Sequence, residues 1–513
     1  MRMLTHASRF QADSLERDAL EILALTRSLK NSLVPVNRIP SEVLLLLPDY
    51  CDKSYADKFL IDSTHVCRSW REIFISRSSL WTNLNFMDVE KTRTYIQRSR
   101  SSSLNISLQN TDDITYLDDA FSLVIPHISR LQSLAIHGDV SPDVLSHFCC
   151  PAPHLEKLDI CITPPDLEFP IFDGSSFNGE LPSLREFSLS GVVTDLGWRN
   201  MKNLTAFTLS NPEAYDVHEV TVTQILDFFE SAPSLRHVEI KNPIPDSSDA
   251  PLWRIVSLPH LKTFSLSTFT SPSTLLNHFH IPPGASLMAW DSVKSEEFSP
   301  LDYLPDKSPN FENLSHIDVV NLYFKPGVKS VLLGGPSGIL FLVCYMKDHQ
   351  TASSVTVDHR ILRSIGPPRL PTIRKIEVSK YAHPPQARVE GCPVFEALFS
   401  LNTLRTLILS DCNPLPFIFA LNPEKNSSAL VPCPNLEELV IYPSLNPRHE
   451  YAGDLVDMSR SRDSKGAKLS SITIVDDSAL EEEVSKLKEH ATRVEHRRES
   501  YTMESPWNSR PDE

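Results

Sequence analysis

One six-residue phrase recurs along this chain and constrains its fold more than any other feature. Its first and sixth residues are aliphatic and its fourth residue is apolar, as in LREFSL at 184–189. Copies begin at Leu131, Leu155, Leu184, Leu204, Leu235, Leu261, Leu314, Ile373, Leu404, Leu436 and Leu469. Short apolar alternation of this kind predicts a β-strand with one buried face.

The positions of proline and the spacing of the copies are stronger evidence for a repeat than the residue types within the phrase. Apolar residues make up 41% of the chain, so chance places a loose phrase of this type in about 1 to 2% of windows. Proline stands two residues before the first aliphatic residue in six of the eleven copies, at Pro153, Pro182, Pro233, Pro259, Pro371 and Pro434. Most copies start 20 to 33 residues apart. The two longer steps, 261–314 and 314–373, each have room for a degenerate copy, and 287–292 is a candidate.

The phrase and its period resemble leucine-rich repeats. Helix-like segments lie between copies, at 142–149, 223–230, 273–279 and 393–399. The resemblance implies strand and helix units that stack into a solenoid with a continuous concave binding face. The asparagine of the common leucine-rich pattern is mostly absent, so we expect uneven curvature.

Basic residues recur at the second position of the phrase, on the expected concave face. They are Arg185, Arg236, Lys262, Arg374 and Arg405, and glutamates stand nearby. A solvated face of mixed charge is one interpretation. The other is a target-binding site in which some arginines bind a phosphorylated or acidic motif, because a guanidinium matches phosphate geometry. The sequence leaves both open.

The segment 38–86 differs in character and is helical. Pro40 suits a first helical turn, Val43 and Leu46 contribute to an apolar face, and Pro48 closes the helix. A polar loop at 49–56 and two short helices follow. In these, Val66, Trp70 and Ile73, together with Cys67 and Phe74, recur at helical offsets, and Leu80 and Trp81 come soon after.

Three ordered clusters in this segment resemble an F-box: IPSEV at 39–43, VCRSW at 66–70 and Leu80-Trp81. The resemblance implies binding to a Skp-type adaptor and, through it, to a cullin ligase core. The implied adaptor-binding residues are Ile39, Pro40, Glu42, Val43, Leu46, Val66, Cys67, Trp70, Leu80 and Trp81. Two departures from the family pattern are Pro48, which cuts the first helix where the family usually continues, and a slightly long loop at 50–55.

Some of these apolar residues could equally form a core. Core packing is the commoner role of apolar residues at helical spacing, and it applies to Val66, Ile73 and Phe74 as readily as an interface does. A domain of about fifty residues buries little surface on its own, so part of its apolar surface is expected to await a partner.

The segment 12–33 places apolar residues roughly at helical spacing, with acidic residues early and Lys30 late, which predicts a helix. We expect it to pack on the following domain. The alternative is a short coiled-coil dimerisation segment, for which about three turns leave little length.

The resulting expectation is an α/β fold with a short all-α module followed by an irregular leucine-rich-repeat solenoid. We expect an N-terminal helix at 1–35, an F-box-like domain at 36–88, a leucine-rich-repeat-like solenoid at 89–478, and a charged helix with a disordered tail at 479–513. The charged helix is expected to cap the array, and the polar composition after Arg497 predicts the disorder.

Net charge and cysteine content limit the classes of partner and the cellular compartment that we expect. The formal net charge of -16 argues against binding nucleic acid or an anionic membrane, because both need a basic face. The longest strongly apolar run, 339–346, is too short to span a membrane, and the N-terminus lacks the apolar stretch of a secretory signal. Nine cysteines in 513 residues fit reduced thiols in the cytoplasm or nucleus.

Motifs for catalysis, cofactors and metals are missing from the sequence. The glycine cluster at 334–338 lacks the Lys-Ser/Thr of a phosphate-binding loop and predicts a surface turn. Cys149 and Cys150 have no second ligand pair at zinc spacing and are interpreted as buried thiols. No metalloprotease histidine pair or nucleophile elbow occurs. We therefore expect no catalytic residue, no cofactor and no metal.

These observations favour a non-catalytic substrate-recognition adaptor of a Skp-cullin-F-box ubiquitin ligase. The helical module would bind the Skp-type adaptor, and the repeats would bind a target protein of unknown identity. The alternative is a protein-interaction scaffold that works without a ligase, because Pro48 distorts the first helix.

Overall fold

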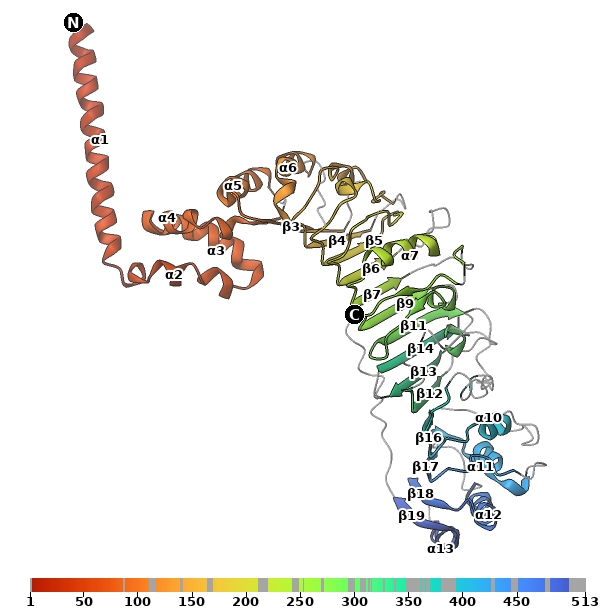
Figure 1. The fold of residues 1–513 in the computed structure, drawn as a ribbon. Coiled ribbons are helices and arrows are strands. Elements are labelled where there is room, and N and C mark those ends of the chain that lie inside the picture. Colours follow the sequence, from red (N-terminus) through yellow and green to blue (C-terminus); the bar gives the residue numbers. More distant parts are fainter. Residues whose placement is uncertain are drawn as a thin grey trace. The chain divides into compact units, whose positions relative to one another are not determined.

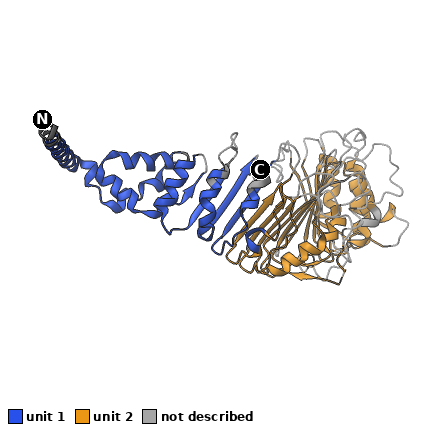
Figure 2. Ribbon diagram, turned by 90° about the horizontal axis from the view of Figure 1, so that it is seen from above, with its two compact units in different colours: residues 1–166, 176–178 blue, residues 167–175, 179–513 orange. Residues whose placement is uncertain are grey.

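The computed structural model describes residues 2–85, 88–109, 117–138, 142–163, 169–210, 220–241, 249–251, 253–268, 272–293, 300–304, 311, 314, 316–325, 328–335, 338–346, 361, 365, 370–379, 394–425, 430–443, 451–475 and 480–497. The fold is mixed α/β, with a large, mostly parallel sheet and helices, and the N-terminal region is helical. The chain forms two compact units (Figure 2). Unit 1 comprises residues 1–166 and 176–178, and unit 2 comprises 167–175 and 179–513.

The first part of unit 1 is helical, with 3-10 helices marked η. Its elements are α1 (Arg2–Ser32), η1 (Pro35–Arg38), α2 (Ser41–Leu44), η2 (Leu47–Tyr50), α3 (Lys53–Val66), α4 (Arg68–Ser76) and η3 (Ser78–Trp81). Pro40 stands directly before α2, and Pro48 lies in the first turn of η2. The expected proline-opened helix is therefore present but has only four residues. Cys67 alone separates α3 from α4, because its backbone is extended (φ -158°, ψ 172°).

Helix α1 is longer than predicted. It has 31 residues and begins at Arg2, whereas the sequence predicted a helix over 12–33. Its large apolar side chains are exposed: Leu15, Ile22 and Leu29 keep 69%, 65% and 66% of their surface accessible. The expected packing of this apolar face on the following domain is therefore wrong.

The second part of unit 1 alternates strands and helices. Its elements are β1 (Asn83–Leu84), α5 (Val89–Ser99), β2 (Leu104–Gln109), α6 (Leu117–Val124), η5 (Ile125–Arg130), β3 (Leu131–Gly138), η6 (Pro142–His147) and β4 (Lys157–Ile162). The strands pair in parallel in the order β1, β2, β3, β4. Leu134 lies opposite Leu158 and Ile136 opposite Ile160, and all four side chains are buried. The expected domain boundary near residue 88 lies inside this unit.

The strands of unit 2 are parallel except around β13. In spatial order they are β5 (Glu186–Ser190), β6 (Ala206–Ser210), β7 (His237–Lys241), β9 (Thr263–Thr268), β11 (Ser286–Val293), β14 (Gly338–Met346), β13 (Val328–Gly335), β12 (Val319–Lys325), β15 (Lys375–Ser379), β16 (Thr406–Cys412), β17 (Glu438–Pro443), β18 (Leu469–Val475) and β19 (Ala491–Arg497). Strand β13 runs antiparallel to both its neighbours. A separate parallel pair joins β8 (Val256–Ser257) to β10 (Phe279–His280).

The helices of unit 2 cover one face of these strands. They are α7 (Val222–Ser231), α8 (Ser273–Leu276), α10 (Val394–Ser400), α11 (Leu415–Leu421), α12 (Tyr451–Ser464) and α13 (Glu481–His490). Figure 1 shows α10, α11 and α12 together on one side of β16 to β18. On the same side of the sheet, the Phe207 ring of β6 lies 4.6 Å from that of Phe228 in α7. The fourth and sixth residues of the phrase, such as Phe187 and Leu189, are buried here.

Strand pairing corrects the phase of one predicted copy of the phrase. Val319 of β12 pairs with Lys375, which is the third residue of the copy that starts at Ile373. The copy on β12 therefore starts at Ile317, and the predicted start at Leu314 is three residues too early. Buried apolar residues at both positions explain the ambiguity.

The two long steps between copies have different structural causes. The candidate copy at 287–292 does lie in a parallel strand, β11, but Ser286 pairs with Thr263, so Leu287 occupies the fourth position of the phrase. The step from 314 to 373 contains the antiparallel strand β13 and also β14, which pairs in parallel with β11 and places Leu340 opposite Leu287, in the fourth position of the phrase.

The helix predictions between copies are largely confirmed. The segments 223–230 and 393–399 correspond to α7 and α10, and 142–149 contains the 3-10 helix η6. The segment 273–279 is helical only at its start, because Phe279 belongs to β10.

The predicted charged helix is confirmed as α13, but it is not the last element. Strand β19 follows it and pairs in parallel with β18. Residues 498–513, for which the sequence predicts disorder, lie outside the described residues.

Candidate functional site

An exposed apolar surface on the helical part of unit 1 is the first candidate interface. Pro40, Val43 and Leu46 lie on and beside α2, and Val66 ends α3. Val43, Leu46 and Val66 keep 47%, 51% and 53% of their surface accessible, whereas Leu44 in the same turn keeps 1%. Leu44 thus secures α2 to the core while its apolar neighbours face solvent. We call Pro40, Val43, Leu46 and Val66 the apolar helical surface.

Trp81 lies in the core of unit 1. Its indole nitrogen donates a hydrogen bond to the main-chain oxygen of Phe74 at 2.9 Å. The Tyr95 ring meets the indole edge to face, 5.0 Å between centroids, and the Arg98 guanidinium lies 4.3 Å from the ring centroid. Trp81 therefore joins α4 to α5 and is fully buried.

Trp70 is also a packing residue. Only 8% of its surface is accessible, and its ring lies 5.9 Å from that of Phe74. Phe59 of α3 meets Phe74 edge to face at 6.3 Å. The structure therefore favours the core interpretation for Phe74, while Ile73 is half-buried and Val66 is exposed.

A polar cluster around Asp57 ties α3 to α5. The Asp57 carboxylate accepts hydrogen bonds from Lys91 Nζ at 2.6 Å, Asn85 Nδ2 at 3.0 Å and Tyr95 Oη at 3.2 Å. Burial raises the pKa of the Tyr95 phenol above its ordinary value, and the Asp57 charge raises it further. Helix α3, which carries Val66, is thus held to α5 by polar contacts.

The ten residues that the F-box resemblance assigns to adaptor binding divide by exposure. Pro40, Glu42, Val43, Leu46 and Val66 are exposed; Ile39, Cys67 and Leu80 are half-buried; Trp70 and Trp81 are buried. Both tryptophan rings are buried and have packing contacts inside unit 1, and direct contact of either ring with a partner stays a prediction. Their aromatic size predicts equally well a core or an interface, which is why the sequence could not separate the two roles.

The strand face that points away from the helices of unit 2 is the second candidate interface. Strand residues alternate between faces, so the burial of the fourth and sixth phrase residues places the fifth and seventh on this open face. Met288 on β11 lies opposite Phe341 on β14, which lies opposite Leu332 on β13. Trp290 occupies the seventh position on β11, and Tyr323 occupies the same row on β12.

These five residues form a contiguous set that we call the open-face patch: Met288, Trp290, Tyr323, Leu332 and Phe341. All five are half-buried. By contrast, Leu287 and Leu340, which point to the helix side of β11 and β14, are fully buried. Large apolar and aromatic side chains on the uncovered side of a sheet are typical of protein-binding surfaces.

The open-face patch was missed by sequence reasoning, although a signal for it exists. Residues 338–346 read GILFLVCYM, an almost continuous apolar run without polar alternation. A strand with this pattern is apolar on both faces. The run indicates that β14 either lies between two layers or carries an apolar open face.

The five basic residues proposed for target binding are exposed and lie immediately before strands β5, β7, β9, β15 and β16. They are Arg185, Arg236, Lys262, Arg374 and Arg405. Main-chain hydrogen bonds link Lys262 to Arg236 and Arg405 to Arg374, each at 2.7 Å, so these form two adjacent pairs. Arg405 contacts the Glu437 carboxylate at 3.0 Å, which favours the mixed-charge interpretation at that end of the row.

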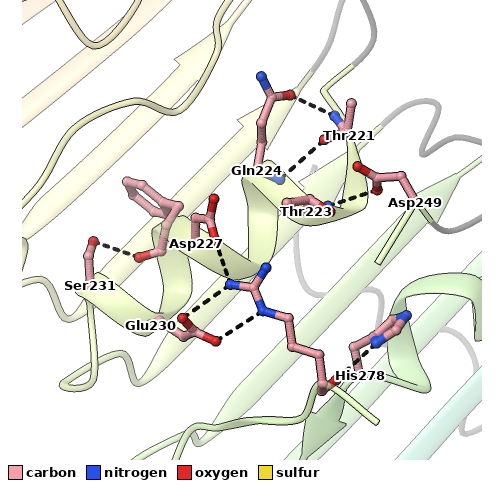
Figure 3. Close-up of polar contacts among 10 residues, drawn as sticks. Thr221, Thr223, Gln224, Asp227, Glu230, Ser231, Asp249 and His278 are labelled. Atoms are coloured by element: carbon pink, nitrogen blue, oxygen red, sulfur yellow. Dashed lines mark hydrogen bonds and ion pairs between the residues drawn. The ribbon is translucent and has the colours of Figure 1, made fainter. Parts of the chain in front are cut away.

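Helix α7 is fixed behind the open face by polar contacts at both its ends (Figure 3). Thr221 and Gln224 form a reciprocal capping box, and the Asp249 carboxylate accepts a hydrogen bond from the Thr223 main-chain nitrogen at 2.9 Å. Near the other end, Arg254 contacts the carboxylates of Asp227 and Glu230. These contacts hold α7 against the strands, on the side of the sheet opposite the open face.

The cysteines and the glycine cluster that the sequence singled out are candidates for a further site. Within the described ranges, no group of three or more histidine, cysteine or carboxylate residues is placed to hold a metal ion. Cys149 and Cys150 are exposed, so the prediction that they are buried thiols is wrong. At the glycine cluster, a Cβ on Gly335 would collide with the main-chain oxygen of His316 and one on Gly338 with that of Ala285; close strand packing therefore explains both glycines.

Among the helices in the described part of the chain, none is both long and apolar enough to cross a membrane. Comparison with protein-family models gives no match for this chain, and a search of curated proteins gives none either.

Proposed function

We propose that this chain is a substrate receptor of a Skp-cullin-F-box ubiquitin ligase. The observation that carries the proposal is the apolar helical surface, which combines the ordered F-box-like clusters of the sequence with side chains left exposed to solvent. The cluster at 39–43 supplies Pro40 and Val43, and the cluster at 66–70 supplies Val66.

The apolar helical surface would bind the Skp-type adaptor. Val43 and Leu46 are about half exposed although they are large and apolar, and covering them would remove apolar area from water at about 25 cal/mol for each Å². Ile39, Cys67 and Leu80 would lie at the margin of the contact. Trp70 and Trp81 would keep the helices in place instead of touching the adaptor.

We infer further that the strands form an irregular leucine-rich-repeat solenoid. Support comes from the coincidence of the phrase with parallel strands in continuous register, as where Leu407 lies opposite Leu439 and Leu439 opposite Ile472. Stacked units of this kind bury each strand against its neighbours and leave one extended face for binding. The antiparallel strand β13 would be an insertion in the array.

The open face would bind the target protein, with the open-face patch as its centre. Aromatic residues and methionine are enriched at the energetic centres of interfaces, and Trp290, Phe341 and Met288 are of these types. The basic residues at the starts of the strands would lie at the edge of the contact, where Arg236 and Lys262 remain suited to an acidic or phosphorylated group.

The mechanism would be proximity. One part of the chain holds the ligase and another holds the target, which raises the effective concentration of target lysines near activated ubiquitin. On this proposal the chain contributes binding, and bond chemistry belongs to other subunits of the ligase.

Co-purification tests the proposal. A tagged full-length chain is compared with a variant that carries Val43→Asp and Leu46→Asp, and the bound Skp-type adaptor and cullin are quantified. Burial of a charge in an apolar contact costs about 2 kcal/mol or more, about thirtyfold in affinity, so the variant should lose both proteins. Ile171→Asp is the matched control, because Ile171 is 66% exposed and lies in unit 2. Equal recovery of the adaptor by all three chains would contradict the proposal.

A second candidate function is a scaffold that works without a ligase. The observation that favours it is the length of α2, which has four residues and ends before the turn that leads to Pro48. A shortened helix offers less surface to an adaptor. Stable capture of other proteins by the open face, with no Skp-type adaptor or cullin recovered, would support this candidate.

A further inference from the structure

Helix α1 presents an apolar row that nothing in the described chain covers. Over its 31 residues the helix extends about 46 Å, at about 1.5 Å for each residue. Leu15, Ile22 and Leu29 are each about two thirds exposed. An exposed row of this length on a single helix indicates an interaction surface.

The row has a seven-residue repeat with alternating size. Leu15, Ile22 and Leu29 are spaced by seven, and a smaller residue stands three positions before each of them: Ala12, Ala19 and Thr26. Positions separated by three and four share one face of a helix. The face therefore has the spacing of a coiled-coil seam in which small and large residues alternate.

A second copy of α1 in antiparallel orientation complements this alternation. In the register that places Ile22 opposite Thr26 of the second copy, Ala19 lies opposite Leu29 of the second copy. Over residues 19–29 each layer then joins one small and one large side chain, which favours even packing. Leu15 falls opposite Leu33 of the second copy, just past the end of α1. In a parallel pair, Ala19 would lie against Ala19 and leave a gap at every second layer.

The flanks of the seam agree with the same register. Glu16 falls opposite Lys30 of the second copy, and two-fold symmetry repeats the pair at the other end. Leu23, which is 45% exposed, falls beside Leu23 of the second copy at the centre. A parallel pair would place Gln11 beside Glu16 and Leu25 beside Lys30, with no opposite charges in contact. Glu16 and Lys30 are both exposed, so they are accessible to a second chain.

We propose that α1 is a dimerisation helix that forms an antiparallel two-stranded coiled coil with α1 of a second copy of this chain. The dimer would carry two apolar helical surfaces and two open faces. A target with two binding segments would then be held by both copies, with the gain in affinity that a linked second contact gives.

Light scattering of the full-length chain over a concentration series tests the dimer. We expect twice the mass of one chain for the natural sequence and the mass of one chain for Ile22→Asp. Leu20→Asp is the matched control, because Leu20 is 60% exposed but lies on the opposite side of α1; this variant should remain dimeric. A monomeric natural chain at every concentration, or an Ile22→Asp variant that dimerises as well as the control, would overturn the proposal.

A charge exchange tests the orientation. Glu16→Lys alone places like charges opposite Lys30 and should weaken the dimer, whereas Glu16→Lys combined with Lys30→Glu should restore it. Absence of restoration would contradict the antiparallel register. The natural chain could instead be monomeric and bind a different protein that the Ile22→Asp variant no longer binds. That result would assign the apolar row to that protein and overturn the proposal.

Discussion

The indole nitrogen of Trp81 donates a hydrogen bond to the main-chain oxygen of Phe74, seven residues earlier, at 2.9 Å. The contact closes the end of α4 onto η3, and both side chains are fully buried. The F-box-like clusters therefore contribute two kinds of residue: exposed ones that a partner could reach, and buried ones such as Trp81 that hold the surface in place.

Trp81→Ala should destabilise unit 1 strongly. Removal of a fully buried tryptophan costs about 3 to 5 kcal/mol, and this variant also leaves the buried Tyr95 ring without its edge-to-face contact. Urea unfolding followed by circular dichroism should show a lower midpoint. Val43→Asp is the comparison, because substitutions of exposed residues usually change stability by about 0.5 kcal/mol or less. Equal stability of the two variants would contradict the division into support and contact residues.

Tyr95→Phe should reduce stability at neutral pH and should change its dependence on alkaline pH. Burial, with a smaller effect from Asp57, raises the pKa of the Tyr95 phenol in the folded protein. Above about pH 10, the unfolded chain loses this proton while the folded chain retains it, so the folded state binds more protons and its stability falls as pH rises. The phenylalanine variant lacks this loss.

Unfolding measured from pH 7 to 11 checks the Tyr95 prediction. The hydrogen bond to the charged Asp57 is worth about 1.5 to 3 kcal/mol, which is the expected advantage of the natural chain at pH 7. The advantage should be constant up to the ordinary phenol pKa and should shrink above it. A difference between the two proteins that stays constant over the whole range would contradict the assignment.

Arg462 should be essential to the C-terminal part of unit 2. The residue is fully buried, and its guanidinium donates hydrogen bonds to the main-chain oxygens of Pro432 at 2.7 Å and Cys433 at 2.9 Å. Arg462→Met fills similar volume but removes the guanidinium donor from both oxygens. The Cys433 oxygen keeps its hydrogen bond from the Leu436 main-chain nitrogen at 3.0 Å, and loss of a buried partner costs about 1 to 3 kcal/mol. We expect a clear fall in melting temperature, and Arg460→Met, at an exposed neighbour, serves as the control. Equal melting temperatures would show that the two hydrogen bonds are not needed.

Phe341→Ser should weaken target capture without loss of fold. Phe341 lies at the centre of the open-face patch and is half-buried. Truncation of a central aromatic contact typically costs about 2 kcal/mol or more. Proximity labelling during proteasome inhibition, compared between the natural chain and the variant, should show a set of proteins that only the natural chain labels. Ile171→Ser is the control, and identical labelling by all three chains would exclude the patch as the target site.

Much of the strand arrangement follows from the sequence, because the aliphatic phrase reports which face of each strand is buried. The phrase predicted strands at β5, β6 and β7, where Phe187, Phe207 and Val238 lie in one buried row. The phrase could not predict β13. An antiparallel hairpin and a parallel unit have the same alternation of apolar residues, and only the pairing of the strands distinguishes them. The offset at Leu314 has another origin, because buried apolar residues stand at both 314 and 317.

The candidate site was less predictable from the sequence than the strands. Size and apolarity cannot separate a residue that packs inside a small helical domain from one that faces a partner, so Val43 and Trp81 looked alike until their burial was known. The residues after the carboxyl end of α1, such as Leu33, do not indicate that the apolar side chains of this helix remain exposed. The open-face patch depends on four strands, β11, β12, β13 and β14, which no local pattern brings together.

Titration of the purified full-length chain with a purified Skp-type adaptor tests the central claim most directly. We predict saturable binding by the natural chain, binding weakened about thirtyfold or more by Val43→Asp with Leu46→Asp, and unchanged binding by Ile171→Asp. No binding by the natural chain, or equal affinity of the double variant and the control, would contradict the account of the apolar helical surface as an adaptor-binding site.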